Sequence, residues 1–139
     1  MVKVAVVLIN YNGMQIKFMN RSILSRCVSD IKKTRFGSFK LVVVDNGSTD
    51  RSREFLKKNK VEFIYRKNNI YNFAVVANMG ITHVVKNYDP EYIVVMSNDV
   101  FLEDRKWLSK MISEMESHPR HVISYKNPHL PFRTKTSHL

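Results

Sequence analysis

The sequence predicts an α/β fold in three layers: a mostly parallel β-sheet with helices on both faces. Three observations predict it. Four short runs of apolar, largely β-branched residues are typical of strands buried on both faces. Segments with apolar residues at helical spacing alternate with these runs, and parallel strands need connections of that kind. The third run is less uniformly apolar, which favours a place nearer the edge of the sheet. The predicted strands are residues 2–9, 39–44, 61–65 and 92–96.

An apolar stripe defines the first predicted helix. It runs from Ile16 to Ile31 and includes Met19, Ile23 and Cys27 at helical spacing. Residues at this spacing lie on one face of a helix, which can then pack on the sheet. We therefore expect a single helix over this segment.

Three further helices follow from the same reasoning. Asn46-Gly47 predicts a tight turn, and Ser48, Thr49 and Asp50 carry oxygens that suit the capping of a short second helix. The third predicted helix covers residues 73–87, and its expected buried face consists of Ala74, Ala77, Ile81, Val84 and Val85. The last predicted helix presents Trp107, Leu108, Met111, Ile112 and Met115 to the core.

The composition fits one globular domain. The chain has 139 residues, and 44% of them are hydrophobic, which is enough for one packed core. The single cysteine, Cys27, excludes an internal disulfide and is expected to be a packed thiol in a reducing compartment. The first apolar run ends at Asn10, no run reaches membrane-spanning length, and no cleavage site follows. We therefore expect a cytoplasmic protein.

The sequence divides into a domain, residues 1–117, and a basic C-terminal arm, residues 118–139. The arm holds prolines and histidines but no Asp or Glu, and residues 121–125 are compatible with a short fifth strand. We expect the rest of the arm to be irregular.

Polar residues follow each predicted strand. The segments are residues 10–12, 45–47, 67–72 and 97–99. Because parallel strands end at the same edge of a sheet, these side chains should converge on one crevice, which is where open α/β sheets bind ligands. Asp45 then either contacts a ligand or only holds the turn that follows it. No glycine-rich dinucleotide motif or P-loop is present, which argues against those two kinds of site.

Four motifs resemble those of family 2 glycosyltransferases of GT-A fold, a Rossmann-like arrangement. They are Asn10-Tyr11-Asn12, Val-Val-Asp-Asn-Gly-Ser-Thr-Asp at 43–50, Ala-Asn-Met-Gly-Ile at 77–81 and Ser-Asn-Asp-Val at 97–100. They occur in the order seen in that family, over about residues 4–115. The valine-rich strand that ends in an aspartate is the most specific of them.

The resemblance implies transfer of a sugar from a nucleotide-diphosphate donor, with UDP as the expected nucleotide, and with Mg²⁺ or Mn²⁺. The metal would neutralise the charge that gathers on the leaving diphosphate. The implied nucleotide-binding residues are Ile9, Tyr11, Asp45, Asn72 and Asn98, and the implied metal ligand is Asp99. Asp45 would accept a hydrogen bond from the base, and Asn98 would face the ribose.

The sequence departs from the family pattern at several points. Ser97 replaces the first aspartate of the Asp-x-Asp element, and Asn72 replaces the usual glycine. The last acidic residue is Glu116, so the expected catalytic base and most of the acceptor-binding half are missing. The catalytic residues therefore stay unassigned; the histidines at 118, 121 and 129 are candidates for the base, although solvated arm residues are the simpler interpretation.

Three functions remain open at this stage. The first is a small glycosyltransferase with an unknown acceptor, and the second is a nucleotide-sugar-binding module without turnover. The third is a protein whose basic surface binds nucleic acid or an anionic membrane, since the net charge of +11 favours an anionic partner. Nucleic acid is the less favoured partner because no stripe of alternating basic and aromatic residues is present. Peripheral contact with an anionic membrane or a partner protein stays open.

Overall fold

The structure is a computed structural model that describes residues 2–118. Its centre is a parallel sheet in the order β5-β4-β1-β6. The predicted fifth strand at residues 121–125, and all of the C-terminal arm except His118, lie outside the described residues. The sheet strands are β1 (Val4–Asn10), β4 (Phe39–Asn46), β5 (Glu62–Arg66) and β6 (Tyr92–Ser97).

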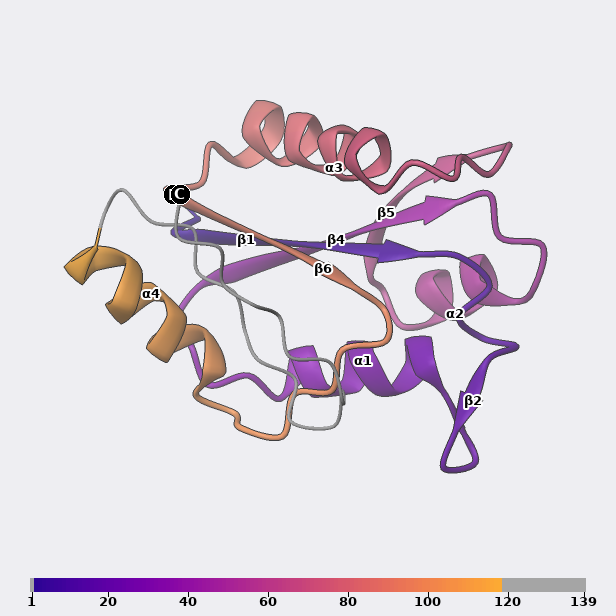
Figure 1. Ribbon diagram of the computed structural model, residues 1–139, viewed down its shortest axis with the longest axis horizontal. Coiled ribbons are helices and arrows are strands. Elements are labelled where there is room, and N and C mark those ends of the chain that lie inside the picture. The colour runs from indigo at the N-terminus through magenta and orange to yellow at the C-terminus, as the bar shows by residue number, and fades with distance from the viewer. Residues whose placement is uncertain (1, 119–139) are drawn as a thin grey trace.

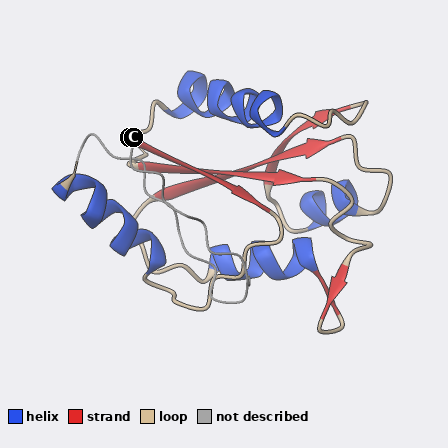
Figure 2. Cartoon of the chain, viewed as in Figure 1, coloured by secondary structure: helices blue, strands red, loops and turns tan. Residues whose placement is uncertain are grey.

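Helices cover both faces of the sheet, as predicted (Figures 1 and 2). α3 (Phe73–Tyr88) lies on one face, and α1 (Ile23–Lys32), α2 (Ser52–Lys58) and α4 (Trp107–Ser117) lie on the other. β5 is at an edge of the sheet, in line with its mixed apolar and polar sequence. Every residue of β1 is buried, because this strand has a neighbour on each side and helices above and below.

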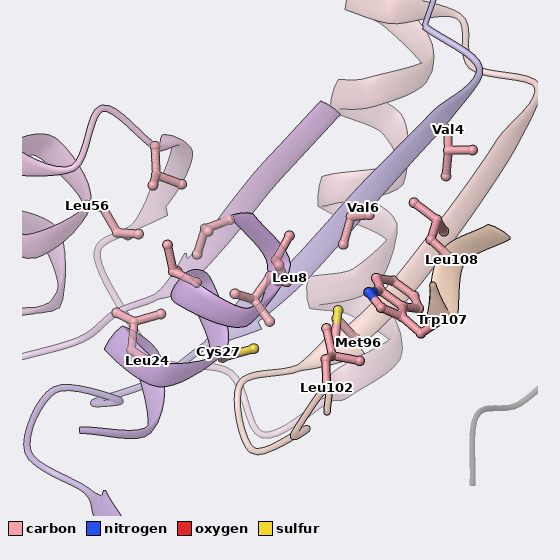
Figure 3. Packing of buried hydrophobic residues seen from close by; sticks show 14 of the residues in the cluster. Val4, Val6, Leu8, Leu24, Cys27, Leu56, Met96, Leu102, Trp107 and Leu108 are labelled. Atoms are coloured by element: carbon pink, nitrogen blue, oxygen red, sulfur yellow. The ribbon is translucent and has the colours of Figure 1, made fainter. Parts of the chain in front are cut away.

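Two hydrophobic clusters fill the spaces between the layers. The larger one lies between the sheet and helices α1, α2 and α4, and its centre is formed by side chains such as Leu8, Leu24 and Trp107 (Figure 3). The smaller one lies under α3 and includes Val7, Val44 and Val76. Alternate residues of each strand point to opposite faces, so each buried strand supplies both clusters.

Cys27 lies in the larger cluster, as its position on the apolar stripe predicts. The thiol is 1% exposed, and burial raises its pKa to about 12. A thiol with so high a pKa is almost entirely protonated at neutral pH and reacts slowly. Cys27 therefore contributes packing to the core.

The predicted helix over residues 16–31 is wrong in its first part. The helix begins at Ile23, and the preceding residues form a hairpin of β2 (Lys17–Phe18) and β3 (Arg21–Ser22). Ser22 ends the hairpin and caps α1, because its hydroxyl accepts a hydrogen bond from the backbone N–H of Ser25 at 3.3 Å. Capping of this kind fixes where a helix begins.

Two smaller expectations are also corrected. Ala74 and Val85 of α3 are exposed, and the face that packs on the sheet is formed by Val76, Ala77, Gly80 and Val84. Ser48 and Thr49 do not cap α2, which begins only at Ser52. The helices in the part of the chain that the structure describes do not reach the length and hydropathy of a membrane span.

Candidate functional site

The sheet register brings the polar strand ends together. Asn10 at the end of β1 pairs with Asp45 of β4, and Ile9 pairs with Ser97 at the end of β6. The segments that follow β1, β4 and β6 therefore leave the sheet at the same edge. This arrangement confirms the expectation that scattered polar residues meet at one side of the sheet.

A chain of buried side chains crosses this edge. The Nδ2 atom of Asn10 donates a hydrogen bond to Oδ1 of Asp45 at 2.8 Å. The Oδ1 atom of Asn10 accepts a hydrogen bond from Nδ2 of Asn98, also at 2.8 Å. Both amides and the carboxylate are at least nine-tenths buried. Asn10 thus links the two sequence motifs at 45 and 98, which lie on different strands.

Asp45 carries an unsatisfied acceptor. The residue is fully buried, and its Oδ1 atom also accepts a hydrogen bond from the hydroxyl of Ser48 at 2.5 Å. Its Oδ2 atom has no hydrogen-bond partner within the protein. A buried polar atom without a partner is unfavourable, so each one calls for an explanation, such as a bound water, ion or ligand. The carboxylate is therefore held in place by one oxygen, while the other is buried without a hydrogen-bond partner within the protein.

Asn12 ties the loop after β1 to the loop after β4. Its Oδ1 atom accepts hydrogen bonds from the backbone N–H groups of Thr49 and Asp50, at 2.8 and 3.3 Å. Its own N–H donates to the Ser48 hydroxyl at 2.9 Å. Asn12 has φ +50°, a conformation that asparagine adopts more readily than most residues.

Asp50 completes the connection between these loops. Its Oδ2 atom accepts hydrogen bonds from the backbone N–H groups of Met14 and Gln15, at 2.8 and 2.9 Å. Sequence reasoning placed Asn12 near the site and assigned Asp50 to the capping of the second helix, but it did not identify these contacts. The available signal is the type of residue, since Asn and Asp readily bond to the backbone of nearby turns.

Asn46 fixes the loop that follows β5. Its Nδ2 atom donates to the carbonyl oxygen of Ile70 at 2.9 Å, and its Oδ1 atom accepts from the N–H of Ile70 at 3.1 Å. Gly47 has φ +75°, and a Cβ atom there would lie only 2.6 Å from the backbone nitrogen of Asn69. The Asn-Gly pair therefore lets the loop after β5 approach the edge closely.

The remaining candidate residues take different positions. Ile9 belongs to the smaller hydrophobic cluster, and its backbone lies between Val44 and Ser97 in the sheet. Tyr11 is partly exposed at the end of β1, whereas Asp99 is exposed in the loop after β6. The side chain of Asn72 is the N-cap of α3, where it accepts a hydrogen bond from the N–H of Val75 at 3.2 Å.

The residues at this edge fit a metal only together with a ligand. The described part of the chain contains no group of three or more His, Cys, Asp and Glu side chains placed to hold an ion. Asp99 is a single exposed carboxylate at the edge, and Mg²⁺ needs about six oxygen ligands. The missing oxygens would have to come from a polyanionic ligand and from water. This edge therefore combines a buried acceptor, a row of amides and one accessible carboxylate.

Comparison with known families decides the classification of this fold. The sequence profile described as Glycosyl transferase family 2 matches residues 5–134. This match covers nearly the whole chain. The chain belongs to glycosyl transferase family 2. The GT-A fold that the motifs imply is therefore shown for this family 2 domain, together with its parallel sheet.

Solved structures share the fold of this family 2 domain at low sequence identity. The crystal structure of S. aureus TarS 1-349 matches with a TM-score of 0.67 and 18% identity over 85% of this chain. A cytidylyltransferase from Leptospira borgpetersenii matches with a TM-score of 0.61, 21% identity and the same coverage. The chain spans 33% of that TarS chain and 50% of the cytidylyltransferase.

A sequence relative is found in Acanthamoeba polyphaga mimivirus. The uncharacterized protein L138 is 26% identical over 130 residues, which is 81% of this chain and 14% of that protein. The chain thus spans a small part of this relative, about a third of the TarS 1-349 chain and 20% of the longer TarS chain.

Proposed function

We propose that this family 2 domain binds the nucleotide-sugar donor of a glycosyltransferase and presents it for sugar transfer. The observation that carries the proposal is the Oδ2 atom of Asp45, a buried carboxylate oxygen at the candidate-site edge of the sheet that has no hydrogen-bond partner within the protein. A nucleobase with an N–H group would satisfy this oxygen. Family membership supports a donor of this class.

The carboxylate favours uracil as the base. Uracil carries a proton on N3, whereas N3 of cytosine is an acceptor and would face another acceptor at Asp45. Hydrogen bonds to a charged acceptor are stronger than neutral ones, and a mispaired buried group is costly. TarS, which has the same fold, has been crystallised with UDP-GlcNAc and with UDP. A UDP-linked donor is therefore the proposed ligand.

A divalent ion is proposed to bind with the donor. Asp99 would hold Mg²⁺ or Mn²⁺ against the diphosphate, and the ion would supply the charge neutralisation that lets the nucleoside diphosphate leave. The buried amide of Asn98 next to it is fixed by Asn10, so the ribose would meet a preorganised group. The acceptor and the catalytic base are not assigned to residues of this chain.

Isothermal titration calorimetry tests the proposal. UDP should bind with a micromolar Kd in the presence of Mn²⁺, and CDP should bind at least about tenfold more weakly, because one buried charge-assisted hydrogen bond is worth roughly 1.5–3 kcal/mol. Asp45→Asn should weaken UDP binding by a similar factor, and Asp99→Asn should remove most of the effect of Mn²⁺. Asp89→Asn is the matched control, because Asp89 is an exposed aspartate at the C-cap of α3.

Equal binding of UDP and CDP, or of UDP to the native protein and to Asp45→Asn, would contradict the assignment of Asp45. Equal binding with and without Mn²⁺ would contradict the role of Asp99. Both outcomes are measurable without knowledge of the acceptor.

A second candidate function is donor binding without turnover. It is favoured by the position of the last acidic residue, Glu116, which lies on α4 and forms an ion pair with Lys3 at 2.8 Å. Residues 117–139 contain no Asp or Glu, so they offer no carboxylate base for an acceptor hydroxyl. Release of UDP from UDP-GlcNAc by the isolated chain, lost in Asp99→Asn, would support a transferase, whereas binding without release would support the second candidate.

A further inference from the structure

A small hairpin projects from the body of the domain next to the candidate site (Figure 1). In this hairpin, β2 and β3 pair in antiparallel fashion, with Phe18 opposite Arg21. The turn residues Met19 and Asn20 have φ values of +48° and +62°. Two successive residues with positive φ form the kind of tight turn that matches the twist of paired strands. The tip of the hairpin is therefore a defined structural element.

The hairpin exposes apolar side chains. Met19 at the tip is 76% exposed, and Ile16 and Phe18 are 48% and 43% exposed. The buried stripe of the following helix begins only at Ile23. Single exposed apolar residues are common, but here three lie within four positions of one hairpin, and grouped exposed apolar side chains mark interaction sites.

Basic residues flank this apolar tip. Lys17 and Arg21 are exposed, and residues 11–29 contain no Asp or Glu. The ion pairs found among the described residues involve neither Lys17 nor Arg21. The guanidinium group of Arg26 lies 4.2 Å from the centre of the Phe101 ring and 5.4 Å from that of Phe18. The patch is thus both apolar and cationic.

The hairpin is attached to the edge that carries the candidate site. The rings of Phe18 and Phe101 stack with their centres 4.7 Å apart. Phe101 follows Asp99 by two residues in the loop after β6. At its base, the carbonyl oxygen of Ile16 accepts a hydrogen bond from the N–H of Ile23 at 2.9 Å. A surface that binds the hairpin would therefore lie close to the candidate donor site.

We propose that the β2–β3 hairpin docks this chain on an anionic lipid surface. Met19 and Ile16 would enter the boundary between head groups and acyl chains, while Lys17 and Arg21 contact lipid phosphates. The apolar side chains suit the acyl-chain region of such a surface, and the flanking cations suit its anionic head groups. A nucleic acid would match the cations but would leave the apolar tip without a partner. The net charge of +11 adds long-range attraction to the same kind of surface.

Flotation with vesicles tests the proposal on the full chain. Vesicles with about one third phosphatidylserine should bind the protein, and vesicles of phosphatidylcholine alone should not. Ile16→Ser/Met19→Ser should weaken binding at least about fivefold, and Lys17→Glu/Arg21→Glu at least about tenfold, since each basic residue near an anionic surface contributes about 1 kcal/mol.

The matched controls change similar residues elsewhere. Val75→Ser/Val85→Ser removes two exposed valines from α3, and Lys57→Glu/Lys58→Glu reverses two exposed lysines of α2. Both controls should reduce vesicle binding less than about threefold. Circular dichroism and thermal unfolding check that each variant is folded. If a hairpin variant and its control reduce vesicle binding equally, the attraction is non-specific and the proposal is overturned. The absence of binding to anionic vesicles would also overturn it.

A second measurement locates the contact. Met19→Cys can be labelled with a polarity-sensitive fluorophore, because Cys27 is buried and its pKa is raised to about 12. Anionic vesicles should shift the emission of this label to the blue, and a label at Val85→Cys should not respond. An unchanged emission at position 19 while the protein floats with vesicles would also overturn the proposal. None of these measurements depends on nucleotide binding, so this proposal and the proposed function fail separately.

Discussion

Asn10 is the residue on which the geometry of the candidate site depends most. Its amide donates to Asp45 and accepts from Asn98, so one side chain fixes groups from two other strand ends. It is fully buried at the end of β1. The oxygen and the NH₂ group of a buried amide both need hydrogen-bond partners, so the neighbouring residues determine its orientation.

Removal of this amide should destabilise the fold. Asn10→Ala leaves Nδ2 of Asn98 without this acceptor and Oδ1 of Asp45 without this donor, and each such loss costs about 1–3 kcal/mol. We expect the free energy of unfolding to fall by about 2–4 kcal/mol in urea titrations. Asn87→Ala removes an exposed asparagine and should change it by less than about 0.5 kcal/mol. A similar, small effect of both substitutions would contradict the role of Asn10.

Substitution of Asp45 should affect ligand binding without a loss of stability, unlike substitution of Asn10. Asp45→Asn keeps an oxygen for the hydrogen bonds from Asn10 and Ser48 and replaces the unpartnered Oδ2 with a neutral amide group. Because a buried charge without full compensation is unfavourable, thermal unfolding should show stability that is unchanged or up to about 1 kcal/mol higher. UDP binding should nevertheless fall. A clear loss of stability would indicate that Asp45 serves mainly to hold the turn.

At the scale of elements, the carboxylate of Glu62 connects strands β5 and β4 with helix α3. Glu62 on β5 accepts hydrogen bonds from Lys40 of β4 at 2.8 Å and from the hydroxyl of Tyr88 at the end of α3. His83 of α3 lies 2.7 Å from its other oxygen. Burial would raise the pKa of Glu62, but the hydrogen bonds with Lys40, Tyr88 and His83 together lower it to about 2. These contacts hold the edge strand to the rest of the layer.

The sign of the pH effect follows from this lowered pKa. The pKa of Glu62 is lower in the folded state than its ordinary value of 4.5. The ionised carboxylate therefore stabilises the folded state at pH values above 4.5, and this stabilisation is lost as the pH falls toward about 2. Glu62→Gln should therefore lower the free energy of unfolding by about 1–2 kcal/mol at pH 7, a figure reduced for solvent screening, and by almost nothing at pH 2. Glu54→Gln, at a surface pair, should have little effect at either pH. An equal loss for Glu62→Gln at both pH values would contradict the ion-pair explanation.

The contact between α3 and the sheet gives a second element-scale prediction. A Cβ atom at Gly80 would lie 2.3 Å from a methyl carbon of Val7 and 2.8 Å from one of Val44. Alanine favours a helix over glycine by about 1 kcal/mol, but overpacking against β-branched side chains in a sheet costs about 1–3 kcal/mol. We expect Gly80→Ala to lower stability by about 1–2 kcal/mol in urea titrations. Gly37→Ala is the control, because a Cβ atom there meets nothing within 4 Å. A stabilising Gly80→Ala would show that the helix shifts without cost.

The sequence predicts the elements whose pattern is local and misses those decided by contacts. Buried strands are identifiable because every residue of a short run is apolar. The hairpin is missed because Ile16 and Met19 continue the helical spacing of the next segment, although the positive φ angles at Met19 and Asn20 interrupt any helix. The buried face of α3 is misplaced because valines surround the helix, so that spacing alone does not define one face.

The candidate site is predictable to the extent that topology determines it. Strand ends of a parallel sheet share an edge, and this alone places Asp45 near Asn98. The individual hydrogen bonds do not follow from topology alone. Asn10 and Asn98 lie 88 positions apart and meet only through the register of β1 and β6. Which oxygen of Asp45 is satisfied and which is free depends on Ser48 and Asn10 together. No local sequence pattern carries that information.

At the scale of the whole molecule, charge is the dominant feature. The formal net charge is +11. The like charges lie closer together in the folded state than in the expanded unfolded chain, so they repel each other more strongly there. Salt screens this repulsion, but it also weakens the surface ion pairs, such as the one between Arg51 and Glu54. Pairs of that kind contribute about 0–1 kcal/mol each, so the surplus charge should decide the direction.

We therefore expect the Tm to rise when NaCl is increased from about 20 to about 200 mM, over which the Debye length falls from about 20 to about 7 Å. Differential scanning fluorimetry at constant pH measures the change, and sodium sulfate at equal ionic strength separates screening from anion binding. If screening is the cause, the two salts should give a similar rise. A much larger effect of sulfate would instead identify a specific anion site, and a falling Tm would show that the ion pairs outweigh the repulsion.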